Sequence, residues 1–412
     1  MDGFNQLGAA GAGKDIAGHR FETSWFWRVL PSGMRRRWWL FRLFDLIARH
    51  WPLLGERKGA LIVRMDGIGD MVLFRRSLDN YGQVLGLSPS EITILGCKSW
   101  GAVAAEIFAG YRLFMIDEHA FARQPFYRFK ISLAVRRLAP SVTICDSYLR
   151  RAMMADSLVW VASAPTSLVS LPFINEPTRT EFTYYLSQVD RIIDTGPYPR
   201  HEIERHAAFM AHFSENTPIP APPKLTWRDI ALNLPTDKPY VVFNPGSNEP
   251  GRCWPLENYI ELADRFAADG WHVVFVGKAK EGATSSVVSR VSSDEYIIDL
   301  TDKTSLPELF DLMNHAALVV SNDTGPAHVA VGLGAPTVVI VGGGHFGCFV
   351  PYPEKIWTAK TRFVHQRMDC YHCFWRCHKR DDPKASFPCI AILTMDQVWK
   401  ACVDLLPKGL TI

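Results

Sequence analysis

A short loop near the middle of the second half of the chain holds residue types that could bind a phosphorylated ligand. Its five candidates are Asp323, Thr324, Gly325, Pro326 and His328. The apolar residues 317–320 before them predict a buried parallel strand, and Gly325 marks the opening of a helix. A helix start at the end of such a strand presents unpaired N–H groups to an anion. We therefore expect Thr324 and the Gly325 backbone to hold a phosphate, although a helix cap beside a buried histidine would give the same pattern.

A second motif, Gly67-x-Gly69-Asp70, follows the predicted strand at residues 60–65. Burial of the Asp70 carboxylate would raise its pKa and let it take a proton from a hydroxyl group. Alternatively, Asp70 caps the following helix. The two glycines also suggest a dinucleotide site, but Val72 stands where the third glycine of that fingerprint belongs.

A third group of candidates lies after the predicted strand at residues 240–243. Gly246 and Ser247 begin this loop, and the glycine allows close approach of the backbone to a ligand. Arg252 further along supplies a permanent cation for a diphosphate leaving group.

Strands and helices alternate in a way that predicts two parallel, doubly wound sheets. We expect four domains or segments: 1–58, a disordered start and a basic helix; 59–215, a first Rossmann-like domain; 216–238, a proline-rich linker; and 239–412, a second Rossmann-like domain. The expected strands are 60–65, 92–95, 113–116, 142–145, 158–161, 240–243, 271–276, 317–320 and 337–341.

Composition indicates a soluble globular enzyme, because 48% of the residues are hydrophobic and 21% are charged. The net charge of +3 over 412 residues is too small to indicate a nucleic-acid partner. Residues 1–20 lack the apolar core of a secretory signal, so we expect nine reduced cysteines in a cytoplasmic protein.

Residues 25–51 predict a basic, tryptophan-rich amphipathic helix. Arg35, Arg42 and Arg49 recur every seven residues beside Asp45 and form a narrow polar stripe on an otherwise apolar helix. Such a helix can lie in the headgroup layer of an anionic membrane or pack on the first domain. We favour the membrane, and expect the chain without residues 1–55 to stay folded and soluble.

The motifs together resemble glycosyltransferase family nine, the heptosyltransferase-like enzymes. The resemblance covers roughly residues 60–405 and rests on Arg64-x-x-Gly67-x-Gly69-Asp70, Asn244-Pro245-Gly246-Ser247, Arg252-x-Trp254-Pro255, the run at 300–309 and Asn322-Asp323-Thr324-Gly325-Pro326-x-His328. It implies a GT-B fold, in which two doubly wound Rossmann-like domains face each other across a cleft, here with an extra N-terminal amphipathic helix.

The resemblance also implies an activity and roles for particular residues. Asp70 would be the general base, and Glu281 would be an acidic contact to the donor. The family more often has lysine near Arg252, which leaves the alignment of that loop open. The implied reaction is inverting transfer of a sugar, such as heptose from ADP-heptose, to a lipopolysaccharide core or related acceptor, without metal or other cofactor.

Two further functions remain as alternatives. One is a catalytically silent relative that binds a nucleotide sugar or glycan at the membrane. The other is a nicotinamide-dependent oxidoreductase using Gly67 and Gly69.

Four cysteines, Cys370, Cys373, Cys377 and Cys389, lie close together in the sequence. Thiolates at this spacing could bind a structural zinc ion. Reduced thiols or a disulfide are the alternatives, and a similar stretch occurs in relatives of the resembled family.

Overall fold

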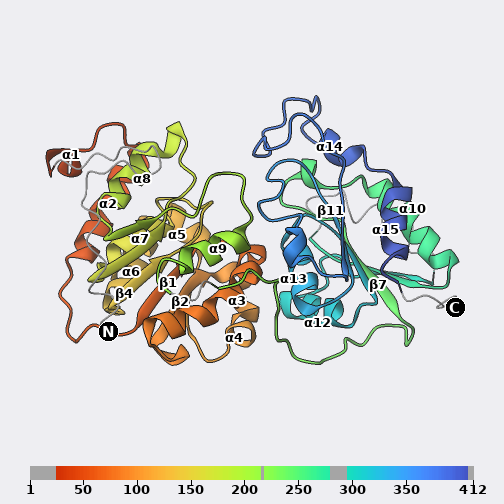
Figure 1. The fold of residues 1–412 in the computed structure, drawn as a ribbon, viewed down its shortest axis with the longest axis horizontal. Helices are drawn as coiled ribbons and strands as arrows, with labels where there is room; N and C mark the ends of the chain where they lie inside the picture. Colours follow the sequence, from red (N-terminus) through yellow and green to blue (C-terminus); the bar gives the residue numbers. More distant parts are fainter. Residues whose placement is uncertain (1–24, 215–217, 279–294, 407–412) are drawn as a thin grey trace. The chain divides into compact units, whose positions relative to one another are not determined.

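The computed structural model describes residues 25–214, 218–278 and 295–406, and they form two compact units (Figure 1). The first is built around residues 25–198 and the second around residues 220–406. Two short segments, Ile68–Arg76 and Pro199–Ile203, group with the second unit by their contacts. Each unit holds one six-stranded parallel sheet flanked by helices, which confirms the predicted pair of Rossmann-like folds.

The first sheet has the strand order β3-β2-β1-β4-β5-β6. Its strands are β1 (Ala60–Arg64), β2 (Ile92–Cys97), β3 (Arg112–Ile116), β4 (Val142–Cys145), β5 (Thr166–Ser170) and β6 (Arg191–Ile193). The principal helices of this part of the chain are α3 (Ile68–Leu85), α4 (Gly101–Ile107), α5 (Glu118–Arg123), α6 (Pro125–Arg137), α7 (Ala155–Ala162), α8 (Arg179–Leu186) and α9 (Glu202–Met210).

The predicted strand at residues 158–161 is wrong, because these residues lie in α7. All eight residues of α7 are buried. A short helix that is buried on every side shows no apolar period, so it cannot be told from a buried strand by pattern alone.

The second sheet has the order β12-β11-β10-β7-β8-β9. Its strands are β7 (Tyr240–Asn244), β8 (His272–Phe275), β9 (Ile297–Asp299), β10 (Leu318–Asn322), β11 (Thr337–Ile340) and β12 (Thr361–Val364). The helices are α10 (Leu256–Ala268), α12 (Leu306–His315), α13 (Gly325–Leu333), α14 (Pro388–Ala391) and α15 (Met395–Val403).

The proline-rich segment before β7 has neither helix nor strand in its described residues 218–239. It is nevertheless anchored to the second unit. The Asp311 carboxylate on α12 accepts hydrogen bonds from the Trp227 indole at 2.8 Å and from the Arg228 guanidinium at 2.9 and 2.7 Å.

The N-terminal helices are α1 (Trp25–Val29) and α2 (Arg36–Arg49), and α2 packs on the first unit. Trp38, Phe41 and Ala48 of α2 are buried in the same apolar core as strand residues of β1. Asp45 accepts from Arg128 of α6 at 2.5 and 3.0 Å, and both side chains are buried. Removing one partner of a buried ion pair is strongly destabilising. The expectation that residues 1–55 can be deleted without harm is therefore wrong for α2.

The arginine stripe of α2 faces the protein. Arg35 pairs with Glu181 at 2.5 Å, Arg42 donates to the Tyr184 hydroxyl at 3.3 Å, and Arg49 donates to the Trp160 carbonyl. None of the helices in the described part of the chain combines the length and the hydropathy that a bilayer-spanning helix requires.

Candidate functional site

Two of the predicted loops leave adjacent strands at the centre of the second sheet. β7 pairs with β10 in parallel, with Asn244 opposite Ser321. The chain runs outward in opposite directions from these two strands, since β8 lies beyond β7 and β11 beyond β10. At such a switch point the two loops after the strands border a crevice at the carboxyl ends of the strands, where open α/β sheets bind ligands. Because β7 and β10 are neighbours, the loop at residues 244–255 and the loop at 323–325 begin side by side.

Two asparagines hold these loops in place, and sequence reasoning gave neither of them a role. The Asn322 amide donates to the Pro245 carbonyl at 2.7 Å, and its oxygen accepts from the Trp254 backbone N–H at 3.0 Å. The Asn244 amide donates to the hydroxyls of Ser321 at 3.0 Å and Thr324 at 3.3 Å. Each asparagine is the last residue of its strand, Asn244 of β7 and Asn322 of β10. Their position at the strand ends, directly before the two predicted loops, was the signal in the sequence that could have indicated this role.

Arg252 lies against the start of α13. One terminal nitrogen of its guanidinium donates to the Asp323 carbonyl and lies 3.7 Å from the Asp323 carboxylate. The guanidinium also stacks on the Trp375 ring, 4.4 Å from its centroid. Its Nε is buried and has no hydrogen-bond partner among the described residues. A half-buried guanidinium with an unused donor suits recognition of a phosphate oxygen.

Asp323 is held in an environment with opposing electrostatic effects. Burial raises the pKa of its carboxyl group, and the positive charge of Arg252 acts in the opposite direction, with burial the larger effect. A half-desolvated carboxylate beside a cation can accept hydrogen bonds from sugar hydroxyls.

The start of α13 is not capped by the Thr324 side chain. Thr324 has extended backbone angles, and its hydroxyl donates to the Asn322 carbonyl at 3.2 Å. Gly325 and Pro326 then open the nine-residue helix. N–H groups at an uncapped helix start carry a partial positive charge suited to an anion. The alternative that the Thr324 side chain caps the helix is therefore wrong.

His328, in the first turn of α13, is a buried and neutral histidine. Its Nδ1 lies 2.9 Å from the Tyr352 hydroxyl. Burial lowers the pKa of His328 to about 3, and the charges of His201 and Arg252 act in the same direction. The ring therefore cannot act as a cation at neutral pH, and one of its two nitrogens already has a protein partner.

The first motif lies at the start of α3 and groups with the second unit. Gly67 is the N-cap of α3, and Asp70 is the third helical residue and half-buried. A Cβ atom at Gly69 would stand 2.9 Å from the His328 ring and 3.2 Å from the Gly325 Cα. Asp70 therefore lies next in sequence to a glycine that touches the predicted phosphate loop.

The same packing argues against a dinucleotide at this turn. In a dinucleotide fingerprint the second glycine lets a pyrophosphate approach the backbone. Here Gly69 is buried, and protein atoms of His328 and Gly325 occupy that space.

Three further residues, Gly246, Ser247 and Glu281, were predicted to bind the donor. Gly246 and Ser247 are half-buried at the start of the loop after β7, and the Ser247 hydroxyl accepts from the Glu249 N–H at 3.4 Å. Glu281 lies outside the described residues.

Several basic residues of the first unit have structural partners. Arg128 is the buried partner of Asp45, and Arg150 is buried with Asp156 at 2.8 Å. Arg64 is buried and lies 2.6 Å from the Asp146 carboxylate. Burial alone would raise the pKa of Asp146, but Arg64, His206 and Tyr81 together hold it well below its usual range.

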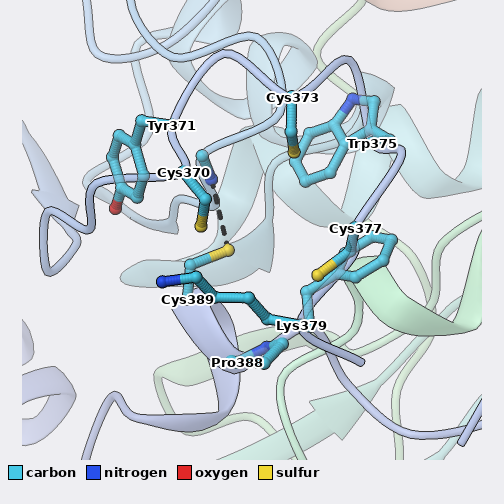
Figure 2. A pocket seen from close by; sticks show the side chains of 10 residues that line it. Cys370, Tyr371, Cys373, Trp375, Cys377, Lys379, Pro388 and Cys389 are labelled. Carbon is cyan, nitrogen blue, oxygen red and sulfur yellow. Dashed lines mark hydrogen bonds between the residues drawn. The ribbon is translucent and has the colours of Figure 1, made fainter. Parts of the chain in front are cut away.

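The four clustered cysteines line one small pocket together with Gly343, which follows β11 (Figure 2). All four are reduced, and the Cys389 sulfur accepts from the Gly343 N–H at 3.4 Å. Burial raises the pKa of the Cys373 and Cys389 thiols, so they stay protonated at neutral pH. Within the described residues, no three His, Cys, Asp or Glu side chains stand together in an arrangement that would hold a metal ion. Trp375, from the same segment, instead stacks on Arg252.

Part of the chain is similar to a known protein family. Residues 179–378 match the family model described as glycosyltransferase family 9 (heptosyltransferase). The matched residues make up just under half of the chain. The match includes Arg252 and the residues at 323–328, while Asp70 lies outside it.

Two curated proteins that are similar to this chain are heptosyltransferases by name. Lipopolysaccharide heptosyltransferase 2 of Salmonella typhimurium is 27% identical over 209 residues, which cover 44% of this chain and 59% of the relative. Lipopolysaccharide heptosyltransferase 2 of Escherichia coli is 26% identical over 185 residues, covering 40% of this chain and 52% of the relative. The chain thus spans about half the length of these curated relatives.

A solved structure is similar over nearly all of its own length. The glycosyl transferase family 9 protein of Veillonella parvula has a TM-score of 0.67 at 18% identity, covering 85% of this chain and 98% of that one. At this identity the likeness shows the fold, and it confirms the expected GT-B class.

Proposed function

We propose that the protein is an inverting glycosyltransferase that moves a heptose from a nucleoside diphosphate donor such as ADP-heptose to a lipopolysaccharide core or a related surface glycan. The names of the relatives support the sugar, the donor and the acceptor. The arrangement of Arg252, Asp323 and the uncapped start of α13 at the switch point of the second sheet carries the proposal, since it offers cationic and N–H groups to a diphosphate.

The proposed reaction is a single displacement at the anomeric carbon. The acceptor hydroxyl oxygen forms a bond to that carbon while the bond to the diphosphate oxygen breaks, and the configuration inverts. Asp70 accepts the hydroxyl proton as general base. The nucleoside diphosphate leaves with the negative charge, which Arg252 and the N–H groups at Thr324 and Gly325 stabilise.

These groups would do the work that a divalent metal does in other transferases. Fixed donors aimed at a developing charge need no reorganisation during the reaction, and a removed donor of this kind typically costs about 10²–10³-fold in rate. We therefore propose a reaction that requires no metal ion.

The acceptor would be lipid-linked, so we place the protein at the inner face of the cytoplasmic membrane. Residues 25–51 would supply the contact to anionic lipid. The structure has α2 packed on the first unit through its arginine stripe, so this contact would use the opposite side of the helix.

A thermal-shift screen over nucleotide sugars and nucleotides tests the donor assignment. We expect specific stabilisation by ADP-heptose and ADP, since a ligand at 100 times its dissociation constant stabilises a protein by about 2.7 kcal/mol. Stabilisation by NAD or NADP, with no response to any nucleotide sugar, would overturn the assignment in favour of an oxidoreductase.

A further inference from the structure

α2 has apolar residues on two sides, one buried in the first unit and one exposed. Asp45 is buried in the first unit, and Arg35, Arg42 and Arg49 bond to groups of that unit. On the opposite side Arg36, Leu40, Leu43 and Ile47 recur every three to four residues and share one face. Leu40, Leu43 and Ile47 are 51%, 57% and 44% exposed. Helices at the surface of globular proteins usually turn polar residues to solvent, so a second apolar stripe that is exposed is unusual.

The exposed stripe continues onto α6. Phe44 of α2 contacts Phe126 and Phe129 of α6, with ring centroids 6.1 and 5.7 Å apart. Phe126 is 80% exposed, and Lys130 follows it one helical turn later on the same face. We define the outer face as Arg36, Leu40, Leu43 and Ile47 of α2 together with Phe126 and Lys130 of α6.

The charge around the outer face has one sign. Among α1, α2 and α6 the single acidic residue is Asp45, and the Arg128 guanidinium neutralises it in the interior. Arg36, Arg37, Lys130 and Arg137 are exposed. Exposed apolar side chains and basic residues on helices that carry no exposed carboxylate match the chemistry of an anionic lipid headgroup layer.

We propose that the outer face is a docking surface for an anionic phospholipid bilayer. Leucine, isoleucine and phenylalanine side chains would enter the boundary between headgroups and acyl chains, and the basic residues would lie at the phosphates. A second copy of the chain fits less well, because pairing two such faces would bring positive charges together with no carboxylate between them. The inference refines the proposed membrane contact, but it does not depend on sugar transfer.

Co-sedimentation of the full-length protein with vesicles tests the docking surface. The vesicles are phosphatidylcholine alone or phosphatidylcholine mixed with phosphatidylglycerol, each at low and high salt. We expect wild-type protein to bind the anionic vesicles, and the binding to weaken with salt. Replacing Leu43→Glu and Ile47→Glu together should lower binding by tenfold or more, as should Arg36→Glu with Lys130→Glu.

Matched variants elsewhere provide the control. Ile230→Glu with Ile392→Glu changes two apolar residues that are 51% and 45% exposed, and Lys384→Glu with Lys400→Glu changes two exposed lysines. These should bind vesicles as wild type does. Circular dichroism and the melting temperature confirm that all variants are folded, since the changed residues are exposed.

Two outcomes would overturn the proposal. One is equal vesicle binding by the outer-face variants and wild type, or no vesicle binding by wild type. The other is a wild-type oligomer, seen by light scattering, that the Leu43→Glu and Ile47→Glu changes convert to monomers without any effect on vesicles, which would make the face a contact between copies. Donor stabilisation in the thermal-shift screen is unaffected in either case, so a failure here leaves the proposed function standing.

Discussion

At the scale of single residues, the Arg252 guanidinium stacks on the Trp375 ring, 4.4 Å from its centroid, and this contact holds the cation of the proposed donor site. The two residues lie far apart in the chain, and the cysteines around Trp375 drew attention to metal binding instead. A cation–π contact depends on tertiary packing and leaves no local pattern. By contrast, Asp323, Thr324 and Gly325 were predictable because the end of a buried strand and the start of a helix are both visible in the sequence.

Arg252→Ala should weaken binding of ADP by about 10–100-fold, because hydrogen bonds to charged groups contribute about 1.5–3 kcal/mol each. Isothermal titration calorimetry measures this directly. Arg265→Ala is the matched control, since Arg265 also stacks on a tryptophan at 4.4 Å but lies on α10 beside Trp399. Unchanged ADP affinity in the Arg252 variant would remove it from the donor site.

Asp70→Asn should lower turnover by about 10²–10⁴-fold while donor affinity stays the same, because a general base acts in the chemical step. Asp79→Asn on the same helix changes a carboxylate that accepts from the Tyr111 hydroxyl at 3.1 Å, and should leave turnover nearly intact. If both variants turn over at the wild-type rate, Asp70 is a structural residue of the first turn of α3.

His328 should make folding sensitive to acid. Its pKa is about 3 in the folded protein against 6.5 as the ordinary value, so between these values the unfolded chain binds a proton that the folded protein does not. Stability is therefore full above pH 6.5 and falls as the pH is lowered toward 3.

We expect His328→Asn to be less stable at pH 7 because it loses the contact with Tyr352. Its unfolding free energy should nevertheless fall less between pH 6.5 and 4.5, by on the order of 2 kcal/mol. Urea unfolding at pH 6.5 and pH 4.5 measures this fall in unfolding free energy for the wild type and the variant. Equal falls in the two proteins would contradict the low pKa of His328.

At the scale of elements, the single amphipathic helix expected over residues 25–51 is two helices, α1 and α2, and its arginine stripe contacts the protein. Arginines spaced by seven residues suggest a solvated face when the sequence is considered alone. In the fold they meet Glu181, Tyr184 and backbone carbonyls that the sequence gives no way to locate. Most of the expected strands were found because parallel strands with buried faces are continuous apolar runs. The short strands β5, β6, β9 and β12 were missed, and α7 was mistaken for a strand because it is buried on all sides.

Asp45→Asn should destabilise the protein by about 3–5 kcal/mol, because it leaves the buried Arg128 guanidinium without its counter-ion. Asp396→Asn removes an exposed carboxylate 3.1 Å from Arg265 and should cost less than about 1 kcal/mol. Chemical denaturation of both variants compares the two pairs. Equal, small effects would show that α2 contributes little to the stability of the first unit.

At the scale of the whole molecule, the two Rossmann-like units were predictable from alternating strands and helices, whereas their catalytic use was not. Length and composition indicated a two-domain enzyme, and the resemblance to family nine supplied the donor and acceptor. Glu281 remains a prediction, because it lies outside the described residues.

Transfer should continue in excess EDTA, because Arg252 and the start of α13 would neutralise the leaving diphosphate. Any zinc in the purified protein would belong to the segment from Cys370 to Cys389, and its removal should lower the melting temperature and leave the chemical step unchanged. Activity that is lost on chelation and restored by magnesium, with no change in melting temperature, would contradict the metal-independent mechanism.

The central claim is sugar transfer with inversion, and analysis of the product tests it most directly. The purified full-length protein is incubated with ADP-heptose and truncated lipopolysaccharide cores, and the products are examined by mass spectrometry and nuclear magnetic resonance. The account predicts a core enlarged by one heptose, with the anomeric configuration opposite to that of the donor, and no product with Asp70→Asn. A product that keeps the donor configuration would contradict the mechanism. Tight binding of ADP-heptose without any transfer to the cores would contradict the claim that the protein is a heptose transferase.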